Sequence, residues 1–131
     1  GHDGGLSTAH GNSSRDILSR LEMMVLMGME LPIAAIRQQI ASGIDLIVHL
    51  GRLPDKSRRV LEITEVCGVK DGEIQISPIY ELEGIGGSWK WKHCGILKNR
   101  KKLEMAGLTR EKGEIDDGLS RVSSEPEGGL L

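Results

Sequence analysis

Apolar residues recur at helical spacing in the first third of the chain. One stripe consists of Ile17, Leu18, Leu21, Met24, Val25 and Gly28. Asn12 or Ser13 can cap the N-terminus of this helix through a side-chain oxygen, and Gly28 ends it. A second stripe runs from Pro32, whose fixed φ suits a first helical position, to Gly43. The pattern predicts two consecutive helices.

Stretches of β-type sequence lie on both sides of these helices. Before them, "LSTAH" at Leu6–His10 predicts a short strand. After them, "IDLIVHLGR" from Ile44 is apolar on nearly both faces, which indicates a central strand covered on both sides. "RRVLEITEV" from Arg58 follows the turn "LPDKS" and predicts an antiparallel partner for that strand. The sequence then predicts three short strands, "EIQIS", "IYELE" and "SWKWK", with Trp89 and Trp91 as packing residues.

The C-terminal part of the sequence changes character again. "LKNRKKLEMAGL" predicts a helix that ends at Gly107. Thr109–Leu131 mixes Glu, Asp, Ser and Gly without a periodic apolar set, which is typical of a disordered tail. We therefore expect one domain over 1–108 and a tail over 109–131.

Composition limits the classes of protein that fit this pattern. The chain has 131 residues, of which 38% are hydrophobic and 2% aromatic, with no Phe. A core of aliphatic side chains and Met favours layers of helix and sheet in one soluble domain. The formal charge of -2 argues against a protein that binds nucleic acid through its overall field, although local basic patches stay open. The apolar runs are too short or too interrupted to cross a bilayer.

The cysteines and histidines offer little catalytic or metal-binding pattern. Cys67 and Cys94 form no C-x-x-C pair, which favours free thiols in a reducing, cytoplasmic compartment. The four histidines and two cysteines lack the spacing of a metal site, so we expect no metal. His49, inside an apolar strand, and His93 are interpreted as structural residues, His49 with a hydrogen-bond partner.

Nucleotide chemistry has one candidate residue in the sequence itself. No G-x-x-x-x-G-K-[ST] phosphate loop occurs, and "GIGGSW" from Gly84 lacks the third glycine of a dinucleotide-binding turn. His10 closes the predicted first strand and precedes a capped helix, whose N-terminal N–H groups suit an anion such as phosphate. The alternative is that His10 and Thr8 share hydrogen bonds in a tight turn.

A family resemblance is carried by the stretch "DGGLSTAHGNSSRDILSRLEMMVLMGMELPIAAIRQQIASGIDLIVHLGRLPDKSRRVLEITEV". It closely resembles the C-terminal half of the secretion ATPases of the type II and type IV pathways, and most of all the CpaF family of Flp pilus assembly. The likeness extends more loosely through "DGEIQISPIYE" and "LKNRKKLEMAGL". It implies an α/β fold: the C-terminal portion of a RecA-like P-loop ATPase core, a mixed sheet with helices that is incomplete without its N-terminal half.

The resemblance also implies a site and a mechanism. "STAHGNS" matches the family's histidine box, so His2 and His10 fall on positions beside the nucleotide, and the chain is expected to begin just after the Walker B segment. Relatives of this kind use ATP and Mg²⁺ and work as homo-oligomeric rings, expected to be hexamers, on inner-membrane pilus or secretion proteins. Because Walker A and Walker B are missing, hydrolysis is expected to be lost in this chain alone. The arginines that could complete the site are Arg15, Arg20, Arg37, Arg52, Arg58 and Arg59.

Two other functions stay open at this point. The chain can be a stand-alone, non-catalytic interaction module of the secretion machinery. It can also belong to a related type IV ATPase that transfers DNA or effector proteins, although the net acidic charge disfavours direct contact with nucleic acid. The resemblance places the complete enzyme at the cytoplasmic face of the inner membrane.

Overall fold

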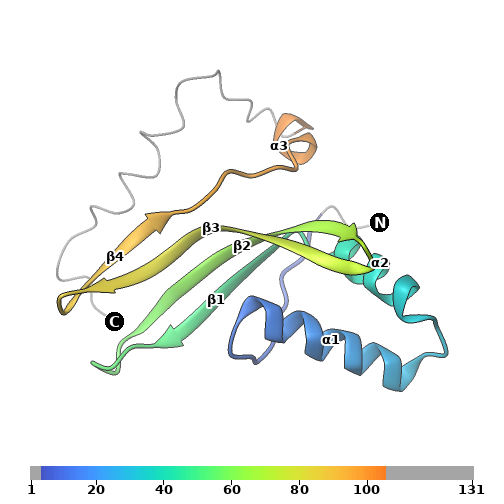
Figure 1. Cartoon of the computed structure of the whole chain (residues 1–131), viewed down its shortest axis with the longest axis horizontal. Coiled ribbons are helices and arrows are strands. Elements are labelled where there is room, and N and C mark those ends of the chain that lie inside the picture. Colours follow the sequence, from blue (N-terminus) through green and yellow to red (C-terminus); the bar gives the residue numbers. More distant parts are fainter. Residues whose placement is uncertain (1–3, 106–131) are drawn as a thin grey trace. The chain divides into compact units, whose positions relative to one another are not determined.

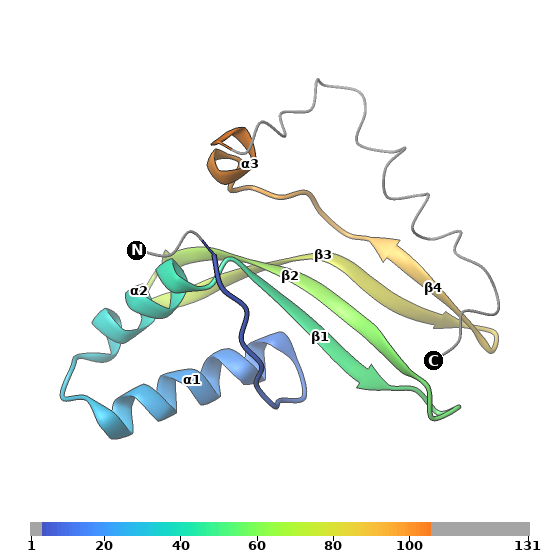
Figure 2. The same ribbon diagram turned by 180° about the vertical axis from the view of Figure 1, so that it is seen from behind.

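The computed structural model describes residues 4–105 and divides the chain into two compact units, Gly1–Lys98 and Asn99–Leu131. The described part of the first unit holds two helices followed by four strands (Figure 1, and from behind in Figure 2). The second unit is described only as far as α3, Lys101–Met105. The predicted tail, 109–131, and the predicted helix stop at Gly107 lie outside the described residues. Within residues 4–105, no helix is long and apolar enough to cross a membrane.

The two predicted helices are confirmed. Helix α1 spans Ser14–Gly28 with Ser13 as its N-cap, and α2 spans Ile33–Gly43. Pro32 is the N-cap of α2 and not its first helical residue. It has an extended backbone and no side-chain oxygen, so the first N–H groups of α2 have no side-chain cap.

The four strands form an antiparallel meander in the order β1-β2-β3-β4. They are β1 (Leu46–Arg52), β2 (Arg58–Lys70), β3 (Glu73–Ile85) and β4 (Ser88–His93). The predicted β1–β2 hairpin and the "SWKWK" strand are confirmed. The parallel strands that a mixed sheet requires are not among residues 4–105.

Three predictions about strands were wrong. Leu6–His10 is irregular chain, because no described strand lies beside it to satisfy its backbone groups. β1 is an edge strand and not a central one, with Val48 49% and Leu50 62% exposed. "EIQIS" and "IYELE" form one strand, β3, because a register shift opposite Thr64 accommodates Pro78 within the ladder.

A small aliphatic core joins the helices to one face of the sheet. Its fully or nearly buried members are Leu18, Ile36, Ile40, Val66 and Ile74. Leu18 comes from α1 and two isoleucines from α2, whereas Val66 and Ile74 come from β2 and β3. Ile47 and Ile76 pack against this cluster, which fixes the face of the sheet that the helices cover.

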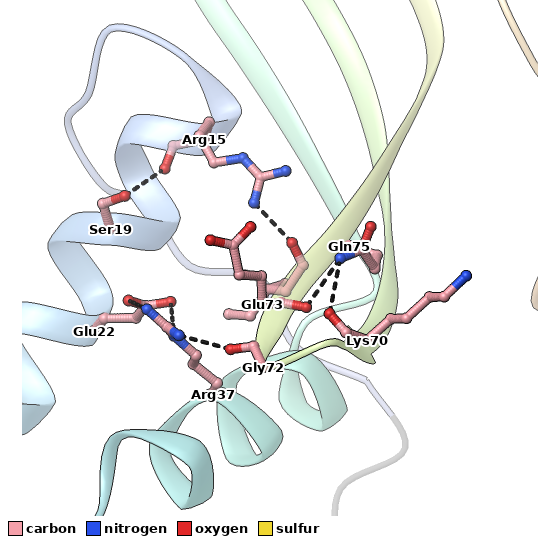
Figure 3. Close-up of polar contacts among 9 residues, drawn as sticks. Arg15, Ser19, Glu22, Arg37, Lys70, Gly72, Glu73 and Gln75 are labelled. Atoms are coloured by element: carbon pink, nitrogen blue, oxygen red, sulfur yellow. Dashed lines mark hydrogen bonds and ion pairs between the residues drawn. The ribbon is translucent and has the colours of Figure 1, made fainter.

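Two arginines fasten the helices to the β2–β3 hairpin (Figure 3). Arg37 of α2 donates from Nη1 to the carbonyl oxygen of Gly72 at 2.6 Å, and from Nε and Nη2 to the two carboxylate oxygens of Glu22 on α1 at 3.1 and 3.4 Å. Arg15 of α1 donates to the carbonyl oxygen of Ile74 at 2.7 Å. Asp71 and Gly72 both have positive φ, which forms the tight turn and presents the Gly72 carbonyl.

Arg37→Met should destabilise the chain strongly. It removes the link among α1, α2 and the hairpin, and it leaves the largely buried Glu22 carboxylate without its cation. We expect a loss of about 2–3 kcal/mol in the free energy of unfolding, measured by urea denaturation. Arg20→Met is the matched control: its ion pair with Asp16 is exposed, so the loss should stay below about 1 kcal/mol. Equal losses in the two variants would contradict this role of Arg37.

Candidate functional site

His10 lies on the irregular segment that enters α1, and its side chain is exposed. The segment and the helix border a hollow of about 590 Å³. Its lining residues include Thr8, Ala9, His10, Ile17, Arg20, Leu21 and Met24. His10, Thr8 and Arg20 can contact a phosphate; the hydroxyl of Ser19, which also lines the hollow, donates to the carbonyl oxygen of Arg15, and the other lining residues are apolar. The structure therefore brings one predicted histidine and one predicted arginine to the same hollow.

The N-terminus of α1 is capped by side chains of the chain itself. Ser13 Oγ accepts a hydrogen bond from the Asp16 N–H at 3.0 Å, and the Asp16 carboxylate accepts one from the Asn12 N–H at 2.9 Å. The Asn12 hydrogen bond, together with the Arg20 guanidinium, lowers the pKa of Asp16 below its usual range. A carboxylate thus stands where the sequence suggested that an anion could bind, so the helix N-terminus is not the free anion site we expected.

The six candidate arginines separate into three groups. Arg15 and Arg37 are held by backbone carbonyls and Glu22, which is a structural role. Arg20 pairs with Asp16 at 3.0 Å and borders the His10 hollow. The remaining three, Arg52, Arg58 and Arg59, are exposed on the β1–β2 hairpin. Arg20 is therefore the only one of the six that lines the same hollow as His10.

The other three histidines lie away from the His10 hollow or outside the described residues. His2 lies outside the described residues. His49, interpreted as a core or groove histidine with a hydrogen-bond partner, is only partly buried because β1 is an edge strand, and the expected partner is not found among residues 4–105. His93 ends β4 and stacks on Tyr80, with ring centroids 4.9 Å apart.

The two cysteines are free thiols, as predicted. Partial desolvation, with the nearby Glu65 carboxylate, raises the pKa of Cys67. Partial desolvation and Glu81 raise the pKa of Cys94 in the same way. A raised pKa keeps a thiol protonated at neutral pH, so neither cysteine is activated as a nucleophile.

Sequence reasoning missed the polar cluster formed by Arg15, Glu22 and Arg37. Its hydrogen bonds join residues 15, 35 and 59 positions apart in the chain. A second hollow of about 300 Å³ lies beside these side chains and is lined by both arginines, Glu22 and Glu73. No local motif signals such a cluster, because its members meet only when the helices dock on the sheet.

Comparison with known proteins finds relatives that are named conjugal transfer proteins. No protein-family model matches it. It is 34% identical over 76 residues to a conjugal transfer protein TrbB of Sinorhizobium fredii, covering 58% of this chain and 22% of the relative. It is 31% identical over 83 residues to TrbB of Rhizobium radiobacter (63% and 24%) and 29% identical over 83 residues to a conjugal transfer protein of Mycobacterium tuberculosis (63% and 23%). The chain spans about a quarter of the length of these relatives.

These similarities correct the family assigned from the sequence. The relatives are conjugal transfer proteins and not pilus-assembly ATPases of the CpaF type, so that assignment was wrong. The resemblance was drawn from the stretch that ends at Val66, which includes "STAHGNS", and this stretch did not separate one branch of secretion proteins from another. The coarser expectation, a link to secretion machinery, is supported by the conjugal transfer relatives.

Ser13→Ala should weaken the start of α1, the element that positions the segment carrying His10. Alanine cannot accept the hydrogen bond from the Asp16 N–H, so the free energy of unfolding should fall by about 1 kcal/mol in thermal or urea denaturation. Ser13→Asp keeps an acceptor and should recover most of the loss. Ser7→Ala, at an exposed position in the entering segment, should change nothing measurable. A Ser13→Ala variant as stable as the wild type would show that this cap contributes nothing.

Proposed function

We propose that this chain forms the C-terminal part of a RecA-like P-loop ATPase core that powers conjugal transfer, a type IV secretion process. The observation that carries the proposal is the similarity to conjugal transfer proteins over 76–83 residues. The position of His10, exposed beside a hollow and next to the first turn of a capped helix, supports a role for "STAHGNS" in that core.

In this proposal the chain contributes a histidine to a nucleotide site, and residues outside this sequence complete that site. The 131 residues contain no phosphate loop, so the groups that cradle ATP and hold Mg²⁺ come from outside this sequence. His10 contacts the terminal phosphate or the attacking water as a positioned donor or acceptor. His2, eight positions earlier in the same sequence block, is proposed as its neighbour in the site.

Arg20 is the arginine proposed to act with His10. Both side chains border the same hollow, and Thr8 adds a hydroxyl to its rim. A guanidinium stabilises the negative charge that develops on a transferring phosphoryl group. Its present partner, Asp16, is on the preceding turn of α1, so a phosphate would compete with a single exposed carboxylate. The ATPase is proposed to act as a homo-oligomeric ring, a hexamer, on the inner-membrane secretion proteins.

The test is ATP hydrolysis by a chimaera in which this chain replaces the matching segment of TrbB from Rhizobium radiobacter. The isolated chain should release no phosphate from ATP, because no phosphate loop is present, whereas the chimaera should hydrolyse ATP. In the chimaera His10→Ala should lower the rate of phosphate release by about ten- to a thousandfold. Folding is checked in each case by thermal denaturation.

His49→Ala is the matched control, since it removes a histidine from the edge strand, away from the hollow. It should leave the rate per folded molecule near that of the parent chimaera. A folded chimaera without hydrolysis would contradict the ATPase proposal. A folded His10→Ala variant at the parent rate would show instead that His10 is only a turn residue.

A further inference from the structure

One face of the sheet is apolar and aromatic over the half nearer the β1–β2 and β3–β4 turns. The helices lie on the opposite face, where Ile47, Val66 and Ile76 pack into the core (Figures 1 and 2). Alternation along each strand, with the register between strands, assigns the residues of the uncovered side. We call this side the open face; it consists of Val48, Leu50, Arg52, Arg58, Val60, Ile63, Tyr80, Leu82, Gly84, Trp89, Trp91 and His93.

The aromatic rings of the open face lie along β3 and β4. Trp91 meets Tyr80 edge to face at 6.3 Å between centroids, and Tyr80 stacks on His93 at 4.9 Å. Trp89 lies over Gly84: a Cβ at that glycine would sit 2.9–3.2 Å from three consecutive carbons of the indole. Near-equal distances to three ring atoms mean that the ring lies flat on the strand. Trp89 and Trp91 are still 41% and 40% exposed, so each keeps a surface available for stacking.

Charge is divided between the two sides of this half of the sheet. None of the twelve open-face residues is a carboxylate; Glu65, the next residue on this side of β2 after Ile63, is buried and accepts a hydrogen bond from the Lys98 N–H. Two of the twelve, Arg52 and Arg58, are exposed and face each other across the β1–β2 ladder. In the same stretches Glu62, Glu81 and Glu83 point to the helix side of the sheet. Like charges opposite each other are unfavourable without a counter-charge. Among residues 4–105 neither Arg52 nor Arg58 has an ion-pair partner.

We propose that the open face binds single-stranded nucleic acid, with bases stacked on Trp89 and Trp91 and phosphates against Arg52 and Arg58. Flat, exposed aromatic rings on a sheet beside a basic rim are the two features that sequence-tolerant recognition of single strands requires. β2, which carries Arg58, and β4, which carries both tryptophans, are the two neighbours of β3, and these residues lie toward the same end of the sheet, beyond the Glu62–Glu81 pair. The net charge of -2 does not reveal the two arginines of the open face, because it sums the charges of the whole chain.

Two other occupants fit the open face less well. A second copy of the chain would bring two basic rims together without an open-face carboxylate to pair with them. A membrane surface favours side chains that project into the headgroup layer, whereas the Trp89 ring lies flat against β3. Binding of nucleic acid is also independent of the ATP hydrolysis proposed above, so either can fail alone.

The experiment measures fluorescence anisotropy of a labelled oligothymidylate of about 16 nucleotides titrated with the full chain. We expect binding that weakens as salt rises from about 50 to about 200 mM, with quenching of tryptophan fluorescence. Trp91→Ala should weaken binding by about five- to a hundredfold, and Trp91→Phe should recover part of the loss. Arg52→Gln with Arg58→Gln should weaken binding and flatten its salt dependence.

Lys90→Gln with Lys92→Gln is the matched control, because it removes two positive charges from the other side of β4. That pair should bind as the wild type does. Absence of binding by the wild type at low salt would overturn the proposal, as would equal losses in the two double variants. Tighter binding to duplex of the same length would exclude stacking. Binding to phosphatidylglycerol vesicles but not to the oligonucleotide, or self-association of the free chain in sedimentation, would assign the open face to a lipid surface or to a second copy.

Discussion

The attachment of the two helices to the β2–β3 hairpin is the constraint on which the first unit depends. The apolar core has few fully buried side chains, all aliphatic, and an antiparallel meander alone buries little. Apolar contacts do not fix the orientation of a helix. Arg37 and Arg15 do, because each guanidinium donates a hydrogen bond to a particular backbone carbonyl oxygen. The turn at Asp71 and Gly72 therefore sets the position of both helices, and through α1 the position of His10.

The same attachment leaves the sheet with one covered and one open face. Both helices pack on the end of the sheet near the β2–β3 turn. The other end, with β4 and the β1–β2 turn, extends past them (Figure 1). Side chains of that half face solvent on both sides. Antiparallel sheets tolerate such exposure when one side is polar. Here the open face is not polar, and large apolar surface without a covering layer marks a binding surface more often than an accident of folding.

The local part of this fold could be predicted from the sequence, and the long-range part could not. Ser13, Asp16 and Gly28 define α1 through contacts within a few residues, so their pattern was sufficient. β1 was misplaced because an apolar run reads the same whether it is covered on both sides or lies at an edge. "EIQIS" and "IYELE" were predicted as separate strands, and only the shift in the pairing of β3 with β2 at Pro78 shows how the strand continues. Of the candidate site, His10 was predicted individually and Arg20 only as one of six arginines. Their common hollow was not predicted, since its extent depends on how the entering segment lies against α1.

The register of β3 against β4 connects the charge pattern to the open face. Glu81 pairs with Lys92 and Glu83 with Lys90 on the helix side, and the Lys92 ammonium lies 3.0 Å from the Glu83 carboxylate. Each exposed ion pair contributes little to stability. A slip of one residue would nevertheless turn the tryptophans to the helix side and the lysines to the open face, because side chains alternate along a strand. It would also move Trp89 away from Gly84, the position on β3 without a Cβ on which its ring can lie flat. Cross-strand charge pairs on one side and the contact between Trp89 and Gly84 on the other thus favour the same register, and that register is what places both tryptophans on the side opposite Glu81 and Glu83.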